Sequence, residues 1–263
     1  MSYLANIVLG HGPQQFTNHH DSGIEAGGGS KHSQTNRANV YEFTSRNGVK
    51  VTILDTPGLA DTRGFEQDKQ HKASIATTIK NKIATVHAVI ILANGTQPRL
   101  GVATDYVLST LSSIFPRSLA DNIGIVFTNV SSPDHWNFDQ NSLPDVLRAR
   151  YENQWLLDNP LSLWKKNQEM QSQPQTRVTK RFRDNPMDML RKRHQAALEE
   201  MCSLFDWLDD RDPQPTNDIW NLYVQSQQID NDIDLAMTRL VQISEKKKLV
   251  DEYKQLANGN ELV

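Results

Sequence analysis

The sequence predicts a three-layer α/β fold, in which a mainly parallel sheet with one antiparallel edge strand lies between helices and is followed by a C-terminal helical extension. Three observations support this prediction. Two β-rich segments meet at an Asn-Gly pair, two continuous apolar runs alternate with helical patterns, and a heptad repeat runs close to the C-terminus. Strands that alternate with helical patterns are typical of parallel sheets covered on both faces.

The antiparallel edge is predicted from residues 39–45 and 49–55, which are joined across Asn47-Gly48. Asn-Gly between β-rich runs is a strong hairpin signal, because both central positions of a two-residue turn then adopt positive φ. Within the first segment the aromatic residues Tyr41 and Phe43 alternate with Val40, Glu42 and Thr44. This alternation indicates an edge strand with one covered face.

The following elements are predicted from hydrophobic periodicity. Residues 65–85 carry small and apolar side chains at helical spacing, and residues 101–115 form a second amphipathic pattern that ends before Pro116. Residues 87–94 and 122–129 are continuous apolar runs of the kind found in buried parallel strands. The expected order is therefore hairpin, helix, strand, helix, strand.

The chain is expected to divide into an α/β part over residues 1–150, a helical extension over residues 151–215 and a coiled-coil-like helix over residues 216–263. Prolines interrupt Gln-, Arg- and Lys-rich helical patches in the middle part. A basic cluster lies between Arg177 and Arg193. Nearby carboxylates favour a solvated helix face or a linker for this cluster, and contact with phosphate or lipid is the alternative.

The last helix is predicted to begin with Thr216 or Asn217 as its N-cap. Its apolar positions alternate spacings of four and three, with one lysine among them: Ile229, Ile233, Ala236, Leu240, Ile243, Lys247 and Val250. This spacing is a heptad seam. Such a helix either pairs with a second copy or another protein, or packs back on its own chain.

Composition excludes several classes of function. The 263 residues carry a formal net charge of −3 and a single cysteine, Cys202. The charge gives no indication of nucleic-acid binding, and one cysteine rules out an internal disulfide framework. The longest apolar run is far shorter than the roughly 18 residues of a transmembrane segment. These features favour a cytoplasmic protein without a membrane span.

The candidate functional site follows from residues 51–64. An apolar strand ends at Asp55, and the chain then turns at Pro57-Gly58. Ligands of open α/β sheets bind at the carboxyl ends of strands. A carboxylate there can hold Mg²⁺ through water, and a glycine lets a backbone N–H approach a phosphate.

With the Asp-Thr-Pro-Gly segment at residues 55–58 after a hairpin and before two further strands, the chain resembles the septin-like and immunity-associated (GIMAP-type) P-loop GTPases over roughly residues 30–135. The resemblance implies a G-domain fold that binds GTP or GDP with Mg²⁺. It places Thr35 and Asp55 at the metal. It also implies that Thr56 and Gly58 contact the nucleotide phosphates and that Thr128 and Asn129 lie at the base.

Three features depart from that family's pattern. No Gly-x-x-x-x-Gly-Lys-Ser/Thr occurs in the chain, and residues 2–9 look like the helix that follows such a phosphate-binding loop. Leu59 stands where small GTPases carry the glutamine that orients water. Residues 127–132 offer neither the lysine nor the aspartate that reads guanine. Nucleotide binding is therefore expected to be impaired.

Two hypotheses from different classes follow. The first is a GTP-binding protein with a Mg²⁺-dependent switch, which is a GTPase if its nucleotide site is functional. The second is a non-catalytic protein derived from a G domain, which associates through its C-terminal helix.

Overall fold

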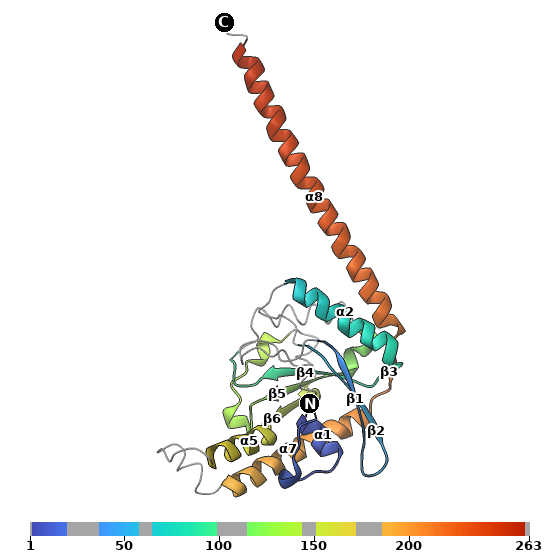
Figure 1. Cartoon of the computed structure of the whole chain (residues 1–263), viewed down its shortest axis with the longest axis vertical. Coiled ribbons are helices and arrows are strands. Elements are labelled where there is room, and N and C mark those ends of the chain that lie inside the picture. Colours follow the sequence, from blue (N-terminus) through green and yellow to red (C-terminus); the bar gives the residue numbers. More distant parts are fainter. Residues whose placement is uncertain are drawn as a thin grey trace.

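The structure, a computed structural model, describes residues 2–19, 37–57, 65–98, 115–143, 151–171 and 186–260. The expected α/β architecture is confirmed. A parallel sheet forms its centre, an antiparallel hairpin lies beside it, and helices pack against both (Figure 1).

The central sheet consists of β4 (Val89–Asn94), β5 (Ile123–Thr128) and β6 (Gln154–Leu157) in the order β4-β5-β6, and all three strands are parallel. The first two strands confirm the prediction from the apolar runs. Strand β6 lies within residues 151–215, where the sequence pattern indicates helices. It has only four residues, and such a short run carries little periodic signal.

The hairpin pairs β1 (Asn39–Thr44) with β2 (Lys50–Asp55), as predicted. Its turn differs from the expected one, because only Gly48 has positive φ, at 84°. The Gly48 N–H donates to the Ser45 carbonyl at 2.9 Å, and the Ser45 N–H donates to the Val49 carbonyl at 2.9 Å. A three-residue loop with one left-handed glycine therefore connects the strands. The prediction of positive φ at Asn47 is wrong.

Three helices pack on one face of the central sheet: α1 (Ser2–Val8), α5 (Pro160–Gln171) and α7 (Pro186–Asp209). Helix α2 (Phe65–Lys82) packs instead against the hairpin and the start of α8 (Figure 1). Side chains of β5 pack on both faces of the central sheet. Val126 packs with α1, α5 and α7, while Ile125 and Phe127 join a cluster formed with residues 136–143. Short 3₁₀ helices complete the described fold: η1 (Pro13–Gln15), η2 (Arg117–Asn122), η3 (Pro133–His135), η4 (Gln140–Ser142) and η5 (Tyr151–Asn153).

The last helix, α8 (Asn217–Asn260), extends away from the body (Figure 1). Its 44 residues correspond to roughly 65 Å. A short antiparallel pair of β3 (Thr85–Val86) and β7 (Gln214–Pro215) joins its start to the end of α2. The predicted cap Thr216 is buried, and its hydroxyl donates to the carbonyls of Ile83 and Ala84. These hydrogen bonds attach the start of α8 to the segment that follows α2.

Two further expectations concern the predicted helix over residues 101–115 and the presence of a membrane-spanning helix. The predicted helix over residues 101–115 lies almost entirely outside the described residues. Within the described ranges, every helix is too short or too polar to cross a bilayer.

Candidate functional site

The carboxyl ends of β4 and β5 lie level with each other. In the parallel register Asn94 is the partner of Thr128. The Thr128 hydroxyl donates to the Ala93 carbonyl at 3.1 Å, and the Gly95 N–H donates to the Thr128 carbonyl at 3.0 Å. These bonds continue the strand pairing past the last residue of each strand, so the two following loops start from a fixed position.

The amide of Asn94 connects the two loops. Its Oδ1 accepts from the Thr96 N–H at 3.2 Å, from the Thr96 hydroxyl at 2.9 Å and from Asn129 Nδ2 at 3.3 Å. Asn129 has φ of 64°, a left-handed conformation that asparagine tolerates better than most residues. All three side chains are exposed. The result is a polar, solvent-accessible cluster at the strand ends.

The loop after β4 is held close to the loop after β5. A Cβ built on Gly95 would lie 2.4 Å from Val130 Cγ2, and Val130 is fully buried. The Asn137 N–H donates to the Gly95 carbonyl at 3.0 Å, and the Asp139 N–H donates to the Pro98 carbonyl at 2.9 Å. Glycine at position 95 is therefore required by the close approach of the two loops.

Asp55 lies at the carboxyl end of β2, opposite Asn39 of β1. Its side chain is half-buried, Thr56 is exposed and Pro57 is fully buried. The preceding Leu54 packs against a cluster that includes Ile75 and Ile79 of α2. Packing on both sides of Asp55 thus fixes the point where the strand ends.

The structure brings together some of the predicted site residues. Thr128 and Asn129 lie with Asn94 at the end of the central sheet, whereas Asp55 and Thr56 belong to the hairpin, which forms a separate sheet. Thr35 and Gly58 lie outside the described residues. Their predicted contacts with Mg²⁺ and phosphate stay predictions.

The described side chains that could bind Mg²⁺ can be compared with the ligands that this ion requires. Across the described ranges, no three His, Cys, Asp or Glu side chains come together as a ligand set. Mg²⁺ keeps several waters and is held by one or two carboxylates together with substrate phosphates. A single carboxylate at a strand end, as at Asp55, fits that requirement.

The end of β5 fits a guanine base less well. A carboxylate can accept two hydrogen bonds from the N1 and N2 donors of guanine, but residues 127–132 contain no carboxylate, and the amide of Asn129 is both donor and acceptor. The Asn94 oxygen beside it already accepts three hydrogen bonds. Asp134 lies in η3 and is exposed. Residues 127–132 at the end of β5 therefore offer guanine no carboxylate.

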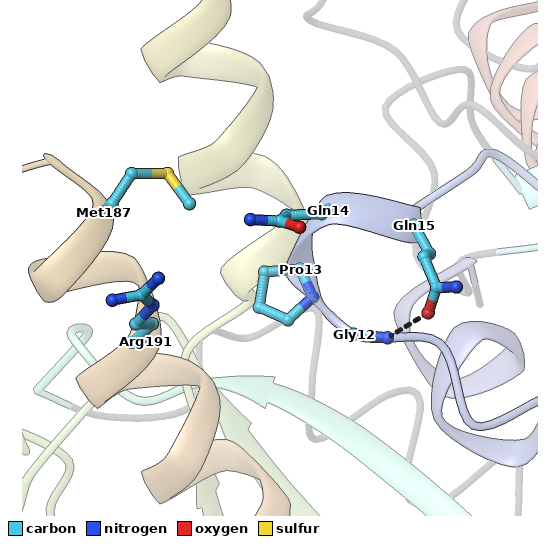
Figure 2. Close-up of a pocket in the computed structure, with 6 residues that line it drawn as sticks. All are labelled: Gly12, Pro13, Gln14, Gln15, Met187 and Arg191. Carbon is cyan, nitrogen blue, oxygen red and sulfur yellow. Dashed lines mark hydrogen bonds between the residues drawn. The ribbon is translucent and has the colours of Figure 1, made fainter.

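A pocket lies elsewhere, between η1 and the start of α7 (Figure 2). It has a volume of about 260 Å³, and it is lined by Gly12, Pro13, Gln14, Gln15, Met187 and Arg191. Arg191 is 3.8 Å from Asp188, which reduces the charge it can offer an anion. Small-molecule sites usually enclose roughly 300 Å³ or more. None of its lining residues belongs to the strand ends described above.

Sequence reasoning missed Asn94 and Gly95. Asn94 ends the apolar run of β4, and a polar residue in that position is a usable signal because strand ends carry ligand-binding groups. The importance of Gly95 had no comparable signal, since it depends on the position of Val130 in the neighbouring loop.

A comparison with protein families matches residues 26–187 to the AIG1 family. A search of curated proteins finds no match. The matched range begins before the hairpin and ends at the start of α7, so it contains Asp55, the hairpin and the whole central sheet. AIG1 proteins are P-loop GTPases of the immunity-associated type, as the sequence resemblance indicated. The chain belongs to the AIG1 family.

Proposed function

We propose that this chain is a guanine-nucleotide-binding protein with a Mg²⁺-dependent switch at Asp55, and that its affinity is weakened because it contains no phosphate-binding loop. The observation that carries the proposal is the position of Asp55, half-buried at the carboxyl end of β2 and followed by the fully buried Pro57. Membership of the AIG1 family supports the nucleotide class.

In this proposal each residue has a defined task. Asp55 and Thr35 would hold Mg²⁺, Asp55 through a water, and the Gly58 N–H would donate to the terminal phosphate. Thr56 contacts the phosphates, while Thr128 and Asn129 contact the base. When bound, Mg²⁺ neutralises charge on the phosphate oxygens. Hydrolysis is expected to be slow, because Leu59 cannot orient a water.

The expected loss of affinity follows from the missing loop. Hydrogen bonds to charged groups contribute roughly 1.5–3 kcal/mol each. Losing several loop amides and a lysine removes an amount comparable with the roughly −8 kcal/mol of micromolar binding. We therefore expect weak nucleotide binding by the 263-residue chain.

Fluorescence titration with a labelled GTP analogue tests the first function. The titration is run with and without Mg²⁺ on the purified chain, on Asp55→Ala and on Asp210→Ala. Asp210 is an exposed carboxylate after α7 and serves as the control. We expect Mg²⁺-dependent binding that Asp55→Ala weakens about tenfold or more and Asp210→Ala leaves unchanged. If the folded chain does not bind the analogue, the proposal of a working nucleotide site is overturned.

A second candidate function, a non-catalytic protein that associates through α8, is favoured by a separate observation. Every residue from 231 to 256 is exposed, so in the described structure the heptad seam does not pack back on its own chain. We propose that this seam binds a second copy or another protein. A single exposed cysteine, Cys202, supports the cytoplasmic location of such a protein.

Substitutions of matched exposure test this association. Ile233 is 54% exposed and lies on the seam, whereas Leu235 is 56% exposed and lies off it. We expect Ile233→Gln to abolish self-association in light scattering and Leu235→Gln to leave it intact. A strict monomer at high concentration, or equal effects of the two substitutions, would contradict self-association through the seam.

A further inference from the structure

We infer that a second copy of this chain binds α8 in antiparallel orientation, with the two-fold axis between Ala236 and Leu240. This inference rests on the second candidate function and names the partner and its direction. Large apolar side chains on the seam of α8 are about half exposed or more: Ile229, Ile233, Leu240, Ile243 and Val250. Helices in proteins are stabilised mainly by packing of an apolar face, so this seam requires a partner.

The two halves of α8 carry opposite charge. Residues 217–238 contain Asp218, Asp230, Asp232 and Asp234 and no lysine or arginine. Residues 239–254 contain five basic residues, Arg239, Lys246, Lys247, Lys248 and Lys254, against three acidic residues. The helix dipole does not explain this division, because its effect is limited to the first and last turns, and Asp230 to Asp234 lie more than three turns from the start of α8.

An antiparallel pair brings these halves together. With the axis between Ala236 and Leu240, Ile233 meets Ile243 of the second copy, and Ala236 meets Leu240. Asp232 and Lys246 occupy the same flanking position of the heptad and approach each other across the pair at both ends, while Arg239, also at this position, approaches its own copy near the axis. Two attractive pairs therefore stand against one like-charge contact. One self-complementary helix therefore supplies both halves of the interface, as a two-fold interface requires.

A parallel pair is disfavoured by the same residues. Lys247 lies on the seam, so in a parallel pair it would face Lys247 of the second copy with both charges partly desolvated. The aspartates of residues 230–234 would also lie side by side. In the antiparallel pair Lys247 lies against Ile229 and close to the acidic half of the second copy.

The body of the protein leaves room for this arrangement. The described contacts between α2 and α8 lie in the first half of α8, where Ile219 is buried, Lys80 lies 3.8 Å from the ring centre of Trp220, and Lys69 lies 3.9 Å from Asp234. The seam beyond Ile229 is exposed. In the antiparallel pair the two bodies lie at opposite ends of the helices, roughly 60 Å apart, so they do not collide.

Charge exchange tests the orientation. Asp232 and Lys246 have no charged residue three or four positions away along the helix, so their exchange does not disturb an ion pair within α8. Sedimentation equilibrium of the full chain measures the dimer dissociation constant for the original chain, Asp232→Lys, Lys246→Asp and the double variant. Circular dichroism checks that each variant keeps its helix content.

We expect each single substitution to raise the dissociation constant about tenfold, because two attractive pairs become repulsive, and the double variant to restore it. Higher salt should reduce these differences. A dimer that the double substitution does not restore would overturn the antiparallel arrangement while leaving association through α8 in place. A monomer at every concentration would overturn both, and neither result depends on nucleotide binding.

Discussion

At the scale of single residues, the loop after β4 depends on the absence of a side chain at Gly95. An added Cβ would lie 2.4 Å from Val130 Cγ2 and 3.0 Å from Phe127 Cβ. Both neighbours are fully buried, so they have little freedom to move. We expect Gly95→Ala to lower the free energy of unfolding by about 1–3 kcal/mol, the usual cost of overpacking.

Gly12→Ala is the matched control for this prediction, because nothing lies within 4 Å of a Cβ at that position and its φ is negative. We expect the control to be neutral or slightly stabilising, since alanine reduces the freedom of the unfolded chain. Urea denaturation of both variants measures the difference. Equal stabilities would show that the loop after β5 relaxes to accept a methyl group.

At the scale of elements, long apolar or alternating runs made the strands predictable. Residues 122–129 became β5, whose continuous apolar side chains are buried on both faces, and residues 87–94 became β4, although Leu92 of that run is exposed. The hairpin was predictable from Asn47-Gly48, which marks a turn whichever residue takes positive φ. The exact turn was not predictable, because the number of loop residues depends on where the strand pairing ends.

The candidate site was predictable only where it coincides with a strand end. Asp55 and Thr128 end apolar strands, and the structure places both there. The hydrogen bond between Asn94 and Asn129 was not predictable, since it joins residues 35 positions apart through the packing of two loops. That contact is set by tertiary structure, and no local pattern in the sequence encodes it.

At the scale of the whole molecule, contacts distant in sequence hold the layer of α1 and α7 together. The Tyr3 hydroxyl lies 3.2 Å from His194 Nδ1, which joins the first helix to a residue 191 positions later. The Phe16 ring packs against His194 with centres 5.3 Å apart. Burial lowers the pKa of His194 below its usual value of 6.5. The neutral imidazole is therefore the form that suits the folded protein.

This pKa shift predicts a loss of stability in mild acid. Above pH 6.5 the imidazole is neutral in both the folded and unfolded states, and its contribution to stability is complete. As the pH falls below 6.5, the unfolded chain takes up the proton first, and stability decreases until the folded protein is also protonated. We expect His194→Gln, which can still hydrogen-bond Tyr3, to lose less stability between about pH 7 and about pH 5 than the original chain.

Urea denaturation at a series of pH values measures this difference. His19 has a lowered pKa as well, from burial and from the charge of His11, so some acid sensitivity remains in the variant. The contribution of His194 is therefore the difference between the two proteins in how steeply the free energy of unfolding falls as the pH is lowered. Identical slopes would mean that protonated His194 is accommodated without cost, so that the contact between α1 and α7 does not depend on its charge.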